Sequence, residues 1–162
     1  MLIRRIAINA SPLITLFKSR QATLLPQLFE EILVPAAVWK EVVVAGPTDI
    51  AAQQLQQVDW ISVVDSVDVI PSVAAWDLGK GETEVLSLVA HLPGYAAVVD
   101  DRAARRCAAA LKLPTLGTGA VIVLAKQQGL ISQIAPGLQA LRNAGLYLSD
   151  GLIVLLKQQA GE

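Results

Sequence analysis

Short apolar runs with high β-strand propensity alternate with longer helical patterns along most of this 162-residue chain. This alternation constrains the fold most strongly, because a parallel strand needs a long connection, usually a helix, before the next strand can pair with it. The expected strands show no regular apolar–polar alternation, which is typical of a sheet covered by helices on both faces. The sequence therefore predicts an α/β fold in three layers, with a central, mostly parallel sheet of four to five strands flanked by helices.

Turn and cap residues set the expected bounds of these elements. A first helix should begin at Ser11 and Pro12, as N-cap and first-turn proline. Residues 65–75 read as a surface loop, and the chain length suits one domain over residues 1–162. The predicted strands are IRRIAIN (3–9), EILVP (31–35), WISVVD (60–65), YAAVVD (95–100) and LPTLGT (113–118). Further helices are predicted over 24–31, 36–44, 49–57, 81–92, 101–112 and most of the chain beyond 118.

Composition excludes several classes of protein. No apolar run reaches the roughly 18 residues that a membrane-spanning helix needs. A single cysteine, Cys107, excludes an internal disulfide framework and a cysteine-rich zinc site, so we expect a cytoplasmic protein without membrane contact. The net charge of −1 gives no overall signal for nucleic-acid binding, although a local basic patch remains compatible with it.

Polar residues stand where two of the predicted strands end. Asn9 ends the first strand, and Asp100 ends the fourth and leads into Asp101. In an open parallel sheet, ligands bind outside the carboxyl ends of the strands. If these two strands are neighbours, Asn9 and Asp100 converge on one crevice, and Thr118 follows the end of the fifth strand nearby.

Two glutamates on predicted helices have two readings each. Glu82 shares a helix face with apolar residues, where an unpaired acid is costly, but it also lies in a first turn that the helix dipole makes favourable for an acid. Glu41 lies on a helix that is apolar nearly all round, and its phase does not place it clearly inward. On pattern alone, a solvated position is the simpler reading for Glu41.

The Asp100–Asp101 pair and the arginines that follow are also open to two readings. One aspartate explains an N-cap, whereas two adjacent carboxylates repel each other unless a cation lies between them. Oxygen ligands without thiolates favour a hard cation, Mg²⁺ or Mn²⁺. Arg102, Arg105 and Arg106 form one basic helix face, which either binds phosphate or pairs with nearby acids.

Four ordered segments resemble a PIN-domain protein. They are NASPLI (9–14), LVPAAVWKEV (33–42), LGKGETEVLSLV (78–89) and VVDDRAARRCAAALKLPTLGTGAVIVLAKQQGLI (98–131). More narrowly, the chain is similar to a prokaryotic branch of predicted nucleic-acid-binding, PIN-like proteins related to VapC-type toxin ribonucleases. The resemblance implies an Mg²⁺- or Mn²⁺-dependent ribonuclease acting on RNA, a small antitoxin protein as partner, and a homodimer or higher homo-oligomer.

The same resemblance assigns roles to particular residues. It implies that the metal and catalytic positions are Asn9, Glu41, Glu82, Asp100 and Asp101, and Ser11 matches the family's small hydroxyl residue two positions after the first acid. The ribonuclease hypothesis then assigns substrate binding to Ser11, Arg102, Arg105, Arg106 and Thr118. Asn9 stands where the family usually has an aspartate, so one negative charge is missing from the implied site. This departure leaves a second hypothesis open, in which the chain is a weakly active or inactive PIN-like module for nucleic-acid binding or assembly.

Overall fold

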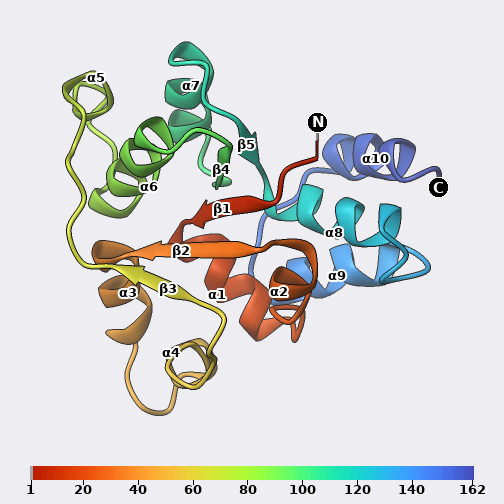
Figure 1. Ribbon diagram of the computed structural model, residues 1–162. Helices are drawn as coiled ribbons and strands as arrows, with labels where there is room; N and C mark the ends of the chain where they lie inside the picture. The colour runs from red at the N-terminus through yellow and green to blue at the C-terminus, as the bar shows by residue number, and fades with distance from the viewer. Residues whose placement is uncertain (1) are drawn as a thin grey trace.

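A five-stranded, all-parallel sheet forms the centre of the computed structural model, which describes residues 2–162 (Figure 1). Its spatial order is β3-β2-β1-β4-β5. The strands are β1 (Arg5–Ile8), β2 (Glu31–Pro35), β3 (Ser62–Val64), β4 (Tyr95–Val98) and β5 (Thr115–Leu116). Each lies within a predicted strand run, which confirms the predicted α/β sheet. All but β2 are shorter than predicted, because residues at the ends of the runs lie in the connecting loops.

Strand β1 lies in the middle of the sheet and pairs on both sides. Ala7 is in register with Leu33 of β2, and Ile8 is in register with Val98 of β4. The chain first moves outward from β1 to β3 and then returns to β4 on the other side. This reversal of direction opens a crevice at the carboxyl ends of β1 and β4, where open α/β sheets bind ligands.

Ten helices surround the sheet within residues 2–162. Helix α6 packs against β1, β2 and β4 and also contacts α5 and α7 (Figure 1). Helix α1 contacts α3 and α4. The bounds are α1 (Ala10–Lys18), α2 (Leu24–Leu28), α3 (Ala36–Val43), α4 (Ile50–Leu55), α5 (Pro71–Ala74), α6 (Lys80–His91), α7 (Arg102–Ala110), α8 (Thr118–Gln127), α9 (Ala135–Asn143) and α10 (Asp150–Gln159).

Two local predictions were wrong. Helix α1 begins at Ala10, and Asn9 rather than Ser11 occupies the N-cap position, because the Asn9 carbonyl already accepts the N–H of Leu13 at 3.3 Å. Pro12 still fits the first turn, where its missing N–H has no intrahelical partner to lose. The predicted loop at 65–75 contains the short helix α5, which begins at Pro71.

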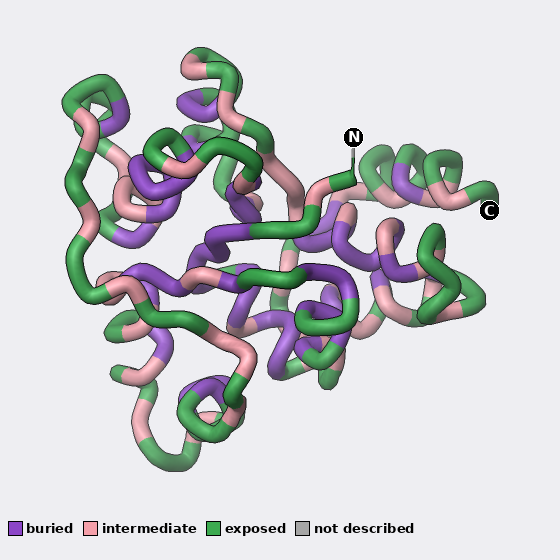
Figure 2. Tube along the Cα trace, in the orientation of Figure 1, coloured by how far each residue is buried: buried purple, intermediate pink, exposed green. Residues whose placement is uncertain are grey.

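Buried apolar residues form one hydrophobic cluster. Figure 2 marks the buried stretches of the chain, which include parts of the central strands. The two central strands are fully covered: Ile6, Ile8 and Val98 have no exposed surface. Cys107 is buried in the same cluster. None of the helices in residues 2–162 has the length and apolar character needed to cross a membrane.

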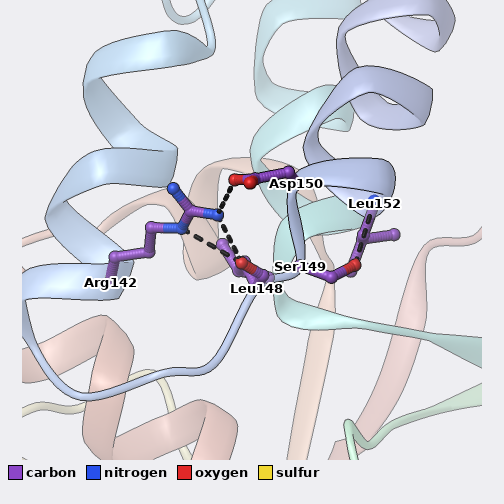
Figure 3. Close-up of polar contacts among 5 residues, drawn as sticks. All are labelled: Arg142, Leu148, Ser149, Asp150 and Leu152. Carbon is purple, nitrogen blue, oxygen red and sulfur yellow. Dashed lines mark hydrogen bonds and ion pairs between the residues drawn. The ribbon is translucent and has the colours of Figure 1, made fainter.

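Helix α10 is held by a compact polar turn after α9 (Figure 3). Arg142 Nε donates to the Leu148 carbonyl at 3.1 Å, and Arg142 Nη2 donates to the same carbonyl. Nη2 also forms an ion pair with the Asp150 carboxylate at 3.0 Å. The Ser149 hydroxyl accepts the Leu152 N–H at 3.1 Å and caps the helix. These bonds fix the start of a helix that is otherwise mostly exposed (Figure 2).

We expect Arg142→Met to destabilise the protein by about 1–2 kcal/mol, because it leaves the Leu148 carbonyl without its charged donor. Amide hydrogen exchange should accelerate over residues 144–152. The matched variant Asp150→Asn removes only an ion pair whose carboxylate is 99% exposed, so it should change stability by less than about 0.5 kcal/mol. Equal losses in the two variants would show that the carbonyl bonds do not hold the turn.

Candidate metal-binding crevice

Asn9 lies at the crevice between β1 and β4, and its backbone ties the two strands together. Its N–H donates to the Val98 carbonyl at 3.1 Å. The side chain is only 6% exposed and does not cap α1, so its amide is free to face inward. A methyl group at Gly81 would lie 3.1 Å from Asn9 Oδ1. The amide oxygen therefore lies against the first turn of α6.

Gly81 marks the point where side chains from three elements meet. The position of a Cβ on Gly81 would also be 3.6 Å from Glu41 Oε1, which extends from α3. Glu82 follows directly on the same turn of α6. The absence of a side chain at Gly81 thus allows the Asn9 amide and the Glu41 carboxylate to approach this turn closely. The structure brings together Asn9, Glu41 and Glu82, as the sequence hypothesis requires.

The electrostatics of Glu82 show which acids share the crevice. Partial burial raises the pKa of this carboxyl above its ordinary 4.5, and the negative charges of Asp101 and Glu41 raise it further. The Gly79 N–H and the Asn9 side chain oppose this rise by hydrogen bonding. Glu82 is therefore a crowded acid within the crevice, which favours a site role over a merely dipole-stabilised first-turn residue.

The structure separates the two members of the aspartate pair. Asp100 Oδ1 accepts the Thr118 N–H at 2.8 Å, and its Oδ2 accepts the Thr118 hydroxyl at 2.5 Å. Asp101 Oδ2 accepts the Ala104 N–H at 2.9 Å and caps α7, while its charge acts on Glu82. Asp100 therefore ties the end of β4 to the start of α8, whereas Asp101 caps α7 and its charge contributes to the raised pKa of Glu82.

Thr118 was assigned to substrate binding, but the structure places it inside the fold. It has no exposed surface, and its hydroxyl donates to Asp100. A fully buried threonine does not contact a macromolecular substrate, so we correct this assignment to the positioning of Asp100. Ser11, in contrast, is exposed in the first turn of α1, two residues beyond Asn9.

Glu84 has a positioning role that the sequence did not reveal. Its Oε1 accepts the Ala37 N–H at 3.3 Å, across the crevice from α6 to the first turn of α3. This bond satisfies one of the unpaired N–H groups at the start of the helix that carries Glu41. The GETE spacing places Glu82 and Glu84 on different helix faces, but only the tertiary contact shows which partner the second glutamate has.

The basic face of α7 is open to solvent. Arg102, Arg105 and Arg106 are all exposed, and Arg105 Nη1 donates to the Val99 carbonyl at 3.2 Å. Over residues 2–162, none of the three lies within ion-pairing distance of a carboxylate. They line an open groove of about 530 Å³ that includes Asp100. The sequence left two roles open for these arginines, phosphate binding or pairing with nearby acids, and the second is not observed in residues 2–162.

The donor chemistry of the crevice fits a hard cation. Asn9 offers an amide oxygen, and Glu41, Glu82 and Asp101 offer carboxylates, the ligands that Mg²⁺ and Mn²⁺ prefer. The side chains are not drawn into a closed cage: no group of three or more His, Cys, Asp or Glu residues in the described part of the chain is placed to hold an ion. Glu41 and Asp101 are exposed. A bound ion would need these two to turn inward.

A family model described as a PIN domain matches residues 5–162. The chain belongs to the PIN-domain family. The match confirms the resemblance seen in the four ordered segments, and it places this protein among nuclease-type domains that generally depend on divalent metal ions. Comparisons with curated proteins and with solved structures gave no match.

The division of the aspartate pair predicts unequal stability losses. Asp100→Ala removes both acceptors of Thr118 and leaves a buried hydroxyl unpaired, so unfolding free energy should fall by about 2–3 kcal/mol. Asp101→Ala removes an exposed N-cap and should cost about 1 kcal/mol. Urea denaturation of both variants measures the difference. Asp101→Ala costing as much as Asp100→Ala would contradict the division.

The raised pKa of Glu82 predicts a pH-dependent effect of Glu82→Gln. A carboxyl with a raised pKa in the folded state binds protons more tightly there, so the metal-free wild type loses stability as pH rises from 4.5 through the folded-state pKa. Glutamine does not ionise. In EDTA, the variant should therefore match the wild type near pH 4 and exceed its Tm by about 1–2 °C near pH 7.5.

Added Mn²⁺ should reverse this order, because a ligand that binds only the folded state raises Tm by mass action and the wild type keeps the full donor set. Thr83→Val, next along the same exposed turn, serves as the control and should show neither effect. If Glu82→Gln raised Tm by the same amount at pH 4 and pH 7.5, ionisation of Glu82 would not be what destabilises the metal-free fold.

Proposed function

We propose that this PIN domain is an Mg²⁺- or Mn²⁺-dependent ribonuclease that hydrolyses RNA phosphodiester bonds. One observation carries the proposal: the Asn9 amide oxygen and the Glu41 carboxylate lie against the turn of α6 that carries Glu82, whose pKa is raised by burial and by the charges of Asp101 and Glu41. Converging carboxylates that destabilise one another without a cation are a typical precursor of a metal site.

The metal would be held by the Asn9 amide oxygen and by carboxylates of Glu41, Glu82 and Asp101. When bound, it would supply an acidified water and neutralise charge on the phosphate that is being attacked. The Asn9 amide contributes an oxygen but no charge, so we propose that the crevice binds one ion rather than two. Asp100 supports the site through Thr118, and Glu84 supports it through the start of α3.

Substrate positioning falls to the exposed residues around the crevice. Ser11 projects from the first turn of α1, close in the chain to Asn9, and can donate its hydroxyl to a phosphate oxygen. Arg102 and Arg106 are exposed, and neither is ion-paired with a carboxylate of residues 2–162, as expected for side chains that grip an RNA backbone. Arg105 shares this face, although one of its N–H groups already bonds the Val99 carbonyl.

A second candidate function is an assembly module, and α10 favours it. Leu152, Val154 and Leu155 are exposed by 39%, 55% and 49%, and within this helix only Leu156 is buried. Such an apolar face suits a homo-oligomer interface or the docking of a small antitoxin protein, and the nuclease hypothesis does not need it. The two functions are compatible, and the toxin of a cytoplasmic toxin–antitoxin pair would use both.

Metal binding and RNA cleavage test the leading proposal together. Calorimetric titration with Mn²⁺ should show one site in the wild type, at least about tenfold tighter binding in Asn9→Asp, and at least about tenfold weaker binding in Asp101→Asn. Cleavage of a fluorescent single-stranded RNA should require Mn²⁺. At a limiting Mn²⁺ concentration, the cleavage rate should be highest in Asn9→Asp, lower in the wild type and lowest in Asp101→Asn. Ser132→Ala, in the exposed segment after α8 and outside both the donor set and the arginine-lined groove, is the matched control.

Two results would contradict the proposal in different ways. Absence of Mn²⁺ binding at millimolar concentration in both the wild type and Asn9→Asp would exclude a metal site in the crevice. Metal binding without cleavage would leave the assembly module as the better function. In that case, Leu152→Asp combined with Leu155→Asp should convert an oligomer into a monomer in sedimentation analysis.

A further inference from the structure

A second cavity lies at the opposite edge of the sheet from the acidic crevice. It has a volume of about 550 Å³ and is formed by the end of α1, by α4 and by the segment that leads into β3. Helix α1 starts beside Asn9 and has nine residues, so its far end lies about 13 Å from the crevice. Helices α1 and α4 contact each other directly (Figure 1). The two sites therefore share no residue.

Aromatic rings form one wall of this cavity. Trp60 stacks on Phe17 with ring centroids 6.0 Å apart and an angle of 17° between the ring planes. Phe17 is buried, whereas Trp60 is only partly buried, and both line the cavity. The stack holds the Trp60 indole in one orientation at the cavity wall. A fixed, partly exposed indole is a suitable platform for a flat ligand.

The charged groups of this cavity are cationic. Lys18 and Arg20 line it, and no aspartate or glutamate does. The Lys18 ammonium has one distant partner, Asp49, at 3.9 Å, whose other oxygen caps α4. In the described structure, Arg20 has no carboxylate within ion-pairing distance. The cavity therefore attracts anions.

Arg20 occupies a backbone position that favours glycine. Its φ is +61°, in the left-handed region. The Arg20 N–H donates to the Phe17 carbonyl at 3.0 Å and the Gln21 N–H to the Leu16 carbonyl at 2.8 Å, which is the usual end of a helix that finishes with glycine. A residue with a Cβ is strained there. The Arg20 side chain lines the cavity in spite of this strain.

Hydrogen-bonding groups complete the cavity. Gln54 and Gln57 line it, and within residues 2–162 their side-chain amides have no hydrogen-bond partner in the protein. A primary amide offers both a donor and an acceptor, which matches the edges of a nucleobase. The cavity thus presents an aromatic platform, two cations and free amides together.

We propose that this cavity binds a nucleotide, with its base stacked at Trp60 and its phosphate at Lys18 and Arg20. Gln54 and Gln57 would bond the edge of the base. This ligand class combines a flat ring, hydrogen-bonding edges and an anion, which are the three features that the cavity accommodates. The nucleotide is either free or an unpaired residue of a single-stranded RNA. The site does not rest on catalysis in the acidic crevice.

Trp60 fluorescence provides the test, in protein carrying Trp39→Phe and Trp76→Phe so that one indole reports. All titrations are made in EDTA, which separates this site from metal-dependent cleavage. AMP and UMP represent the free nucleotide, an eight-residue single-stranded RNA represents the polymer, and ribose and tripolyphosphate are controls. Saturable quenching by a mononucleotide or by the RNA supports the proposal and identifies the source. No saturable binding of either at millimolar concentration would overturn it, as would tripolyphosphate binding as tightly as AMP.

Arg20→Gly distinguishes a lost contact from a damaged fold. Glycine relieves the left-handed strain, so Tm should rise by about 2–3 °C while nucleotide affinity falls by roughly tenfold or more. Lys112→Gly is the matched control: Lys112 has φ +59° at the end of α7, with the same pair of hydrogen bonds. It should raise Tm without changing affinity. Unchanged affinity in Arg20→Gly, or an equal loss in Lys112→Gly, would overturn the proposal.

Discussion

The pairing of β1 between β2 and β4 is the constraint on which the rest of this structure depends. The register that sets Ile8 beside Val98 brings the ends of two distant segments together, and the Asn9 N–H closes the pair on the Val98 carbonyl. Because every strand is parallel, all carboxyl ends lie at one edge. The crevice is therefore a product of topology: the chain turns away from β1 in both directions, and no helix can fill the space between the two outgoing connections.

The acids in this crevice are held against their mutual repulsion by the surrounding fold. Gly81 leaves room for the Asn9 amide and the Glu41 carboxylate beside the first turn of α6. The pKa of Glu82 on this turn is raised by burial and by the charges of Asp101 and Glu41. The Ala37–Glu84 bond and the Asp100–Thr118 bonds tie the supporting helices to the same place. Such an arrangement lowers stability in the absence of a cation, which is a common property of sites selected for function. The PIN-domain match places this geometry in a nuclease-type family.

Much of the fold and part of the site could be predicted from local sequence. Strand β2 has the bounds that EILVP predicts, because Pro35 cannot continue the ladder and the five residues are strongly β-prone. The position of Asn9 at the carboxyl end of β1 was predicted correctly, because a polar residue directly after a buried strand marks the end of that strand. The N-cap at Ser11 was wrong because the helix start depends on which carbonyl accepts the Leu13 N–H. Thr118 was misassigned because burial depends on how α8 packs, which local pattern does not encode.

The sequence by itself determined the α/β class, the strand ends and the residue types available there, since these follow from hydrophobic period, chain stiffness and side-chain chemistry. Only the tertiary structure decided the different roles of the two adjacent aspartates. Neighbouring residues after a strand point in different directions, and the choice was made by Thr118, eighteen positions downstream of Asp100, which binds both of its oxygens. The cavity beside Trp60 is likewise invisible in the sequence, because Arg20, Gln54 and Trp60 meet only when α1 and α4 pack together.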